Sequence, residues 1–217
     1  EIHRRRGDGG SADAAGVLVD LAELEQLRAR YGAAEALCTE ALAIQRRVLG
    51  PHHPEVAATL VRLSSVRLDL GEPAQAETFL REALEIQRDS LEAGHPELVD
   101  TVNQLAMTLF HQGRLNEAED LYRESLGLLR ARLGNMHTRV ADTLNDLGAI
   151  VFSLFRFDEA IHLYKEALAI RRRLYGERHI DVAESYLQIG RAQFQINRLD
   201  EAEASQRRSL EIITGLL

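Results

Sequence analysis

Residues 144–148 read Leu-Asn-Asp-Leu-Gly, and residues 160–168 read Ala-Ile-His-Leu-Tyr-Lys-Glu-Ala-Leu. Both patterns recur along the chain with a constant spacing of 42 residues. Each repeat contains one alanine followed seven positions later by a second small residue: Ala34 with Ala41, Ala76 with Ala83, Ala118 with Ser125, Ala160 with Ala167, and Ala202 with Ser209. A repeat of this length indicates an array of similar supersecondary units, which bury their apolar faces against one another.

Each repeat predicts two helices. The Leu-x-x-Leu-small pattern puts its apolar residues on one face of a first helix, and the paired small residues lie on one face of a second helix, where they allow close packing. Residues 49–54, Leu-Gly-Pro-His-His-Pro, typify the connector, in which glycine ends one helix and proline begins the next. We expect an all-α fold, a right-handed α-solenoid of five helix-turn-helix repeats, with helices over 14–30, 33–48, 55–70, 74–90, 97–112, 116–132, 139–154, 158–174, 181–196 and 200–215.

The composition excludes several function classes. Of the 217 residues, 45% are hydrophobic, which is enough for a continuous core. The net charge of -8 disfavours binding to nucleic acid. Cys38 is the only cysteine, which excludes an internal disulfide and a cysteine-based zinc site and fits a cytoplasmic location. No apolar run reaches the ~18 residues that a membrane span needs, so we expect no membrane insertion.

The small-residue spacing resembles the tetratricopeptide repeat (TPR), and the 42-residue length with its Leu-Gly-x-x-His-Pro-like connector is similar to the kinesin light chain subclass. The resemblance covers nearly the whole chain. It implies a superhelix whose concave groove is lined by the first helix of each repeat. In kinesin light chains, the first Asn of the Leu-Asn-Asn-Leu-Ala pattern contacts cargo peptide. Asn103 and Asn145 match that position, whereas Val61 and Leu187 do not.

The two ends of the sequence depart from the repeat pattern. Residues 1–13 are expected to be the tail of a preceding repeat and a flexible connector, so we expect the chain to be part of a longer protein or to have its ends covered. The TPR superhelical domain is expected over 14–217, with repeats at about 14–53, 54–95, 96–137, 138–179 and 180–217. The last helix is expected to expose Leu210, Ile213, Leu216 and Leu217, which favours end-to-end self-association.

Four positions on each first helix are predicted to face the groove, at spacings of three, four and three residues that keep them on one helix face. The candidate peptide-binding residues are Asp100, Asn103, Met107 and Phe110 in one helix, Asp142, Asn145 and Phe152 in the next, and Glu184, Arg191 and Phe194 in the last. One row is acidic and another is aromatic, a combination that suits a peptide with basic residues and an apolar anchor.

Each row also has a structural interpretation. Acidic residues in the first turn of a helix interact favourably with the helix dipole, and the phenylalanines can pack against neighbouring first helices instead of lining a groove. The two asparagines favour ligand contact, because Asn is a mediocre helix former and has no capping role in the middle of a helix.

Three features of the sequence could be taken for metal, anion or catalytic sites. A histidine occupies four connectors, at His53, His95, His137 and His179, but neighbouring repeats are roughly 8–10 Å apart, too far for their residues to share a metal ion. We therefore expect no metal and no cofactor. An arginine recurs near the end of the second helices, at Arg46, Arg88, Arg130 and Arg172, where stabilisation by the helix dipole competes with an anion-binding interpretation. Cys38 occupies the position of Tyr122 and Tyr164, which predicts a buried filler rather than a nucleophile.

The sequence contains no grouping of a nucleophile with a base, so it predicts no enzyme. It predicts instead a protein–protein interaction module, an adaptor or scaffold that holds a partner peptide or segment in its groove. The alternative is a sensor or regulatory TPR arm of a larger signalling protein such as an NTPase.

Overall fold

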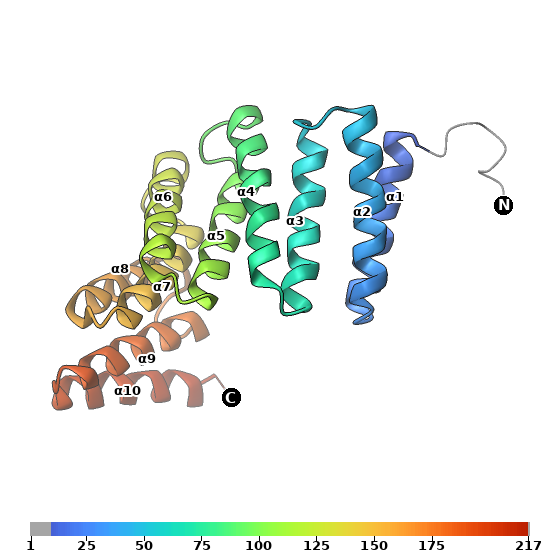
Figure 1. The fold of residues 1–217 in the computed structure, drawn as a ribbon. Coiled ribbons are helices and arrows are strands. Elements are labelled where there is room, and N and C mark those ends of the chain that lie inside the picture. Colours follow the sequence, from blue (N-terminus) through green and yellow to red (C-terminus); the bar gives the residue numbers. More distant parts are fainter. Residues whose placement is uncertain (1–9, 217) are drawn as a thin grey trace. The chain divides into compact units, whose positions relative to one another are not determined.

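The computed structural model describes residues 10–216, and every element of regular secondary structure among them is an α-helix. The helices are α1 (Ala12–Leu27), α2 (Tyr31–Val48), α3 (Pro54–Asp69), α4 (Pro73–Ser90), α5 (Pro96–His111), α6 (Leu115–Leu133), α7 (Thr138–Ser153), α8 (Phe157–Tyr175), α9 (Ile180–Gln195) and α10 (Leu199–Thr214) (Figure 1). This is an all-α solenoid of helical repeats, as the 42-residue period predicts. Most boundaries agree with the predicted ones to within one residue, and the predicted tail of a preceding repeat lies largely outside the described residues.

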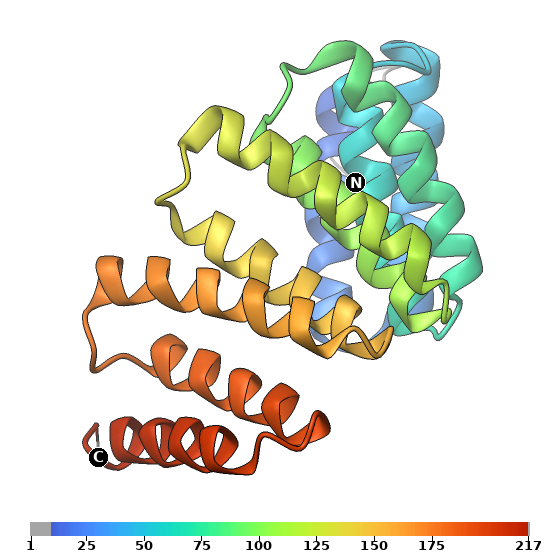
Figure 2. The same ribbon diagram turned by 90° about the vertical axis from the view of Figure 1, so that its left-hand side faces the viewer.

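The chain divides into two compact units, one ending at Gln112 and one beginning at Gly113. The first unit contains α1 to α5 and the second contains α6 to α10. Within the second unit, α7, α8, α9 and α10 follow one another with alternating direction (Figure 2). The boundary falls inside the third repeat, so each unit has its own set of first and second helices.

The core of the first unit is built from the repeat positions that the sequence marks as apolar. Leu60, Leu63 and Val66 of α3 are at most 3% exposed and pack in one cluster with Cys38 and Leu42 of α2. Burial raises the pKa of the Cys38 thiol to about 11, which keeps the thiol neutral and unreactive. The predicted role of Cys38 as a buried filler is therefore confirmed.

The second unit uses larger fillers at the same position. Tyr122 of α6 and Tyr164 of α8 are at most 2% exposed. The small residues on either side of Tyr164 in the sequence, Ala160 and Ala167, are fully buried. Within the fifth repeat, the side chain of Ser209 in α10 donates a hydrogen bond to the Ala183 carbonyl of α9 at 2.7 Å. Small residues therefore allow the close helix approach that the pattern predicts.

The connectors end and begin helices as expected. Gly134 and Gly176 cap α6 and α8 with φ of 74° and 80°, the left-handed region that glycine adopts without strain. Pro54 and Pro96 occupy the first helical position of α3 and α5, where the missing N–H costs nothing.

Two of the recurring arginines of the second helices form ion pairs between repeats. Arg46 of α2 pairs with Glu82 of α4 at 2.5 Å, and Arg130 of α6 pairs with Glu166 of α8. These arginines also lie in the last helical turn, as expected for a favourable dipole interaction. Because carboxylates already pair with them, the anion-binding interpretation has no support at these two positions.

Candidate functional site

We define the first-helix face as the four predicted groove positions of each first helix. In the first unit these are Ala58, Val61, Ser65 and Leu68 of α3 and Asp100, Asn103, Met107 and Phe110 of α5; in the second unit they are Asp142, Asn145, Ala149 and Phe152 of α7 and Glu184, Leu187, Arg191 and Phe194 of α9. Every one of these side chains is exposed or half-buried, while the Leu-x-x-Leu residues of the same helices are buried. The first-helix face is therefore a solvent-accessible surface in each unit.

Asn103 and Asn145 are half-buried in the middle of α5 and α7. The Oδ1 atoms of both side chains are buried and have no hydrogen-bond partner within the described part of the chain. Asn145 interacts through its side chain with the neighbouring Asp146 carboxylate and so helps to keep that group ionised. A buried carbonyl oxygen without a donor costs free energy, so a rotation of either half-buried side chain that brings its oxygen to an N–H group at the surface would remove this cost.

The acidic row lies deeper in its helices than the sequence analysis assumed. Asp142 and Glu184 are the fifth residues of α7 and α9, and Asp100 is the fifth of α5. The acidic residues in the first turns are instead Glu97 and Asp181. The helix-dipole interpretation of this row is thus wrong, because the dipole acts within the first turn.

Asp142 has a structural partner. Its Oδ1 accepts a hydrogen bond at 2.9 Å from Arg171 of α8, which is only 5% exposed. The same guanidinium donates to the Ser185 hydroxyl at 2.9 Å and to the Asp181 carbonyl at 3.3 Å, both in α9. Arg171 therefore ties three helices together, and the opposite edge of Asp142 remains exposed on the first-helix face.

Asp146 is a half-buried acid that the sequence analysis did not single out. Burial raises the pKa of its carboxyl to about 6, and the negative charge of Asp142 acts in the same direction. The side chains of Asn145 and Arg171 oppose the shift. The sequence already distinguishes Asp146, because the equivalent positions of the other repeats carry Arg62, Gln104 and Gln188, none of which is acidic.

The aromatic row divides between packing and exposure. Phe152 is half-buried and makes an edge-to-face contact with Phe157 of α8, with ring centroids 5.1 Å apart. Phe194 is 59% exposed. Phe110 is half-buried and lies 5.6 Å from the ring of His111. Of the three phenylalanines, Phe194 is thus the most available to a partner. Met107 of α5 and Arg191 of α9, at the preceding face position, are also exposed.

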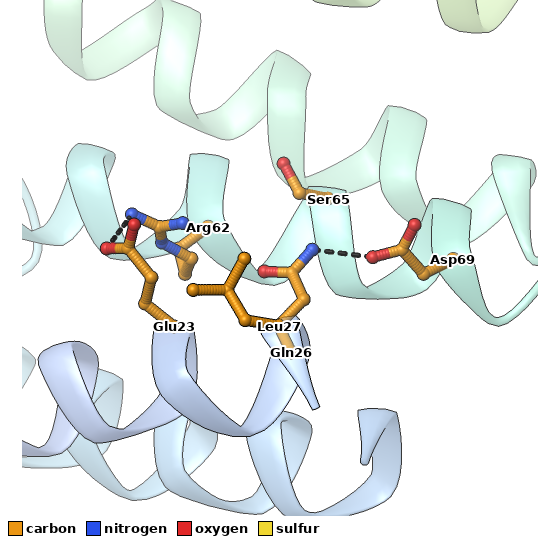
Figure 3. Close-up of a pocket in the computed structure, with 6 residues that line it drawn as sticks. All are labelled: Glu23, Gln26, Leu27, Arg62, Ser65 and Asp69. Atoms are coloured by element: carbon orange, nitrogen blue, oxygen red, sulfur yellow. Dashed lines mark hydrogen bonds and ion pairs between the residues drawn. The ribbon is translucent and has the colours of Figure 1, made fainter. Parts of the chain in front are cut away.

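An open pocket of about 430 Å³ lies between α1 and α3 in the first unit (Figure 3). It is lined by Glu23, Gln26, Leu27, Arg62, Ser65 and Asp69. Extending the 42-residue register to the first repeat would have found it, because Glu23 matches Ser65 and Gln26 matches Leu68. The first-helix face therefore continues onto α1.

The four connector histidines cap helices. The Nδ1 atom of each accepts a hydrogen bond from the backbone N–H two residues later: His53 from Glu55 at 3.2 Å, His95 from Glu97 at 3.4 Å, His137 from Arg139 at 3.1 Å, and His179 from Asp181 at 3.2 Å. This contact satisfies one of the free donors at a helix start. Among residues 10–216, no group of three His, Cys, Asp or Glu side chains is arranged to hold a metal ion.

A family comparison agrees with this architecture. The family model of the tetratricopeptide repeat matches residues 13–89, 58–131, 97–172 and 139–214. The chain belongs to the tetratricopeptide repeat family. The overlapping matches include α1 to α10 almost completely, so the TPR assignment applies to both units.

Solved structures with the same fold include kinesin light chain-like TPR proteins. BtubC (BKLC) from P. vanneervenii is 24% identical, with a TM-score of 0.83 over 94% of this chain and 82% of that chain. A kinesin light chain-type protein of nearly identical TPR-like repeats from Podosopora anserina is 20% identical, with a TM-score of 0.85 over 95% of this chain and 98% of that chain. These likenesses establish the TPR fold.

A third similar structure contains a peptide. It is the Rap conjugation gene regulator of the plasmid pLS20 in complex with the Phr* peptide, 13% identical, with a TM-score of 0.62 over 92% of this chain and 53% of that chain. Among curated proteins, a sequence search finds no match. Within the described residues, no helix of this TPR protein has the length and apolar character needed to cross a membrane.

Proposed function

We propose that this TPR protein is a protein–protein interaction module, an adaptor or scaffold that binds a segment of a partner on its first-helix faces. The observation that carries the proposal is the pair of buried Asn103 and Asn145 Oδ1 atoms without hydrogen-bond partners. They occupy the same repeat position on α5 and α7, where rotation of each half-buried side chain can present its acceptor to a bound backbone N–H.

The surroundings of the two asparagines define the chemistry of the partner. Met107 is an exposed apolar side chain on the first-helix face of the first unit, and Phe194 is one on that of the second unit; such side chains anchor a partner through burial of apolar surface. Asp100 of the first unit and Asp142 and Glu184 of the second unit are exposed near the starts of their own helices. We expect a segment that contributes backbone N–H groups, an apolar anchor and basic residues.

The family supports binding over catalysis. The Rap regulator shows that a protein of this fold is found with a bound peptide, which makes the same mode reasonable for the first-helix face. We propose no catalytic role, no nucleic-acid partner and a cytoplasmic location. The regulatory-arm alternative makes the same binding prediction and differs only in that binding would control a linked domain.

A selection experiment tests the proposal. The chain is immobilised and challenged with a phage-displayed library of random 12-residue peptides, and enriched peptides are synthesised and titrated by fluorescence anisotropy. Asn103→Ala, Asn145→Ala and the double variant are compared with wild type. Because a hydrogen bond contributes about 1 kcal/mol, we expect losses of about fivefold for a single variant and more than tenfold for the double variant.

Two exposed asparagines outside the face provide the control. Asn116 and Asn135 are exposed in the second unit, and their double replacement by Ala should leave the affinity unchanged. Failure to enrich any peptide overturns the proposed function. Enriched peptides that bind the Asn103/Asn145 double variant as tightly as wild type overturn the assignment of the binding face.

A further inference from the structure

The pocket between α1 and α3 has an uneven charge balance. The Arg62 guanidinium donates to the Glu23 carboxylate at 2.8 Å, so these two charges neutralise each other. Across the pocket, the Asp69 carboxylate accepts a hydrogen bond at 2.6 Å from the neutral amide of Gln26. Asp69 has no ion pair within the described part of the chain, and it is exposed.

Figure 3 shows how these groups lie. Glu23 and Arg62 occupy one end of the pocket, Asp69 occupies the other, and Gln26 and Leu27 lie between them. Leu27 is 79% exposed, and its side chain lies on the Arg62 side of Gln26, so it provides an apolar surface between Arg62 and Asp69. An apolar surface that leads along the pocket to an unneutralised acid matches a side chain with a hydrocarbon stem and a cationic head.

The charge of the whole first unit points in the same direction. Residues 10–112 contain sixteen acidic and eight basic side chains, whereas residues 113–216 contain sixteen acidic and fifteen basic ones. Almost all of the net negative charge of the chain thus belongs to the unit that contains the pocket. A surplus of this size attracts cationic partners and accelerates their association.

We propose that this pocket binds an arginine side chain of the partner segment, with the guanidinium on Asp69 and the stem on Leu27. This rests on the proposed function, because the arginine is supplied by the bound segment. The planar guanidinium pairs with a carboxylate through two parallel N–H···O bonds, which a lysine ammonium cannot do. Arg62 remains on Glu23, so charges of opposite sign alternate through the occupied pocket.

The test isolates the pocket from the rest of the face. The ¹⁵N-labelled full chain is titrated with N-acetyl-arginine amide while its backbone amide spectrum is recorded, and N-acetyl-citrulline amide serves as the uncharged analogue of the same shape. We expect saturable shifts at the amides of Gln26, Leu27 and Asp69 with the arginine probe. The citrulline probe should cause clearly smaller shifts at equal concentration, by a factor of up to about five, since an accessible ion pair contributes up to about 1 kcal/mol.

Three variants should change arginine binding in three different ways. Asp69→Asn removes the unneutralised acid and should weaken arginine binding about fivefold. Arg62→Gln frees Glu23 and should strengthen it by a similar factor. Glu85→Gln removes one charge from the exposed surface of α4 and should leave binding unchanged. Equal shifts with citrulline, or equal binding by Asp69→Asn and wild type, overturn the proposal.

These outcomes are separable from those of the peptide selection. Arginine-dependent shifts at the pocket without enriched peptides would retain the pocket and remove the proposed function. Enriched peptides that depend on Asn103 or Asn145 but tolerate replacement of every arginine by citrulline would retain the function and remove the pocket.

Discussion

The ring of Tyr164 in α8 lies against the backbone of Gly148 in α7, so that a β-carbon on Gly148 would be 2.6 Å from the tyrosine Cε1 atom. Gly148 is the small residue of the Leu-x-x-Leu-small pattern, and Tyr164 is the large filler between Ala160 and Ala167. The absence of a side chain at one position thus makes room for the ring at the other. The contact gives a packing reason for a glycine at this helical position, where it costs about 1 kcal/mol relative to Ala.

Gly148→Ala should therefore destabilise the protein although it raises helix propensity. We expect the free energy of unfolding to fall by about 1–3 kcal/mol because the buried ring must move, as measured by urea denaturation. Gly127→Ala is the matched control, since nothing lies within 4 Å of its added β-carbon in α6, and it should stabilise by about 1 kcal/mol. Tyr164→Leu should reduce the cost of Gly148→Ala. A stabilising Gly148→Ala would refute the packing argument.

The connector histidines should behave as helix caps. His137 accepts from the Arg139 N–H at 3.1 Å at the start of α7. His137→Ala should lower the free energy of unfolding by about 1 kcal/mol, whereas His137→Asn, a preferred capping residue, should retain most of it. His162→Ala, at an exposed position within α8, should change stability by less than about 0.5 kcal/mol. Equal losses for Ala and Asn at position 137 would exclude the capping role.

Phe155 is held in a conformation that phenylalanine rarely adopts. It has φ of +62° and is 79% exposed in the turn between α7 and α8, where Gly71 and Gly113 have φ of +77° and +78° in earlier repeats. The left-handed conformation costs roughly 1–2 kcal/mol for a residue with a β-carbon. Phe155→Gly should therefore stabilise by about 0.5–1 kcal/mol, after loss of its ring contact with Phe157.

The same change at Phe194 supplies the contrast for this prediction. Phe194 is also exposed but lies in the last turn of α9, so Phe194→Gly should destabilise by about 0.5 kcal/mol through lost helix propensity. Thermal unfolding of both variants measures the opposite signs. Destabilisation by Phe155→Gly to the same extent would show that the turn carries no strain.

The 42-residue period was sufficient to predict the fold because the same pattern of apolar and small residues predicts the same two helices in every repeat. Glycine and proline mark the connectors, so the helix ends could be placed to about one residue. The solvent-accessible placement of the first-helix face also follows from period alone, since helical spacing separates it from the buried leucines. Its role in binding a partner stays a prediction.

The interactions between repeats could not be predicted in the same way. The contact of Arg171 with Asp142 and Ser185 depends on distances between helices far apart in sequence, which the period does not contain. The period does place Glu23 and Gln26 on the face of α1, since they match Ser65 and Leu68, but it does not contain the pairing of Glu23 with Arg62 across the pocket. The histidine caps depend on which ring atom faces the helix start, which spacing cannot reveal.

Asp146 should make stability depend on pH in the sense opposite to that of an ion-paired acid. Its pKa is raised from the ordinary value of 3.8 to about 6, mainly by burial. Between these two values the folded chain binds more protons than the unfolded chain, so this group's contribution to the free energy of unfolding decreases as pH rises. The penalty is complete above about pH 6 and is lost as the pH falls below it.

Asp146→Asn removes the ionisable group and should therefore stabilise the protein selectively at neutral pH. We expect a gain of about 2 kcal/mol in the free energy of unfolding at pH 7.5, shrinking steadily towards pH 4.5, from urea denaturation of variant and wild type. Asp120→Asn, at an exposed position of α6, should give a difference near zero throughout. A stabilisation that is constant across this range, or a loss at pH 7.5, would show that Asp146 is not held partly neutral by its surroundings.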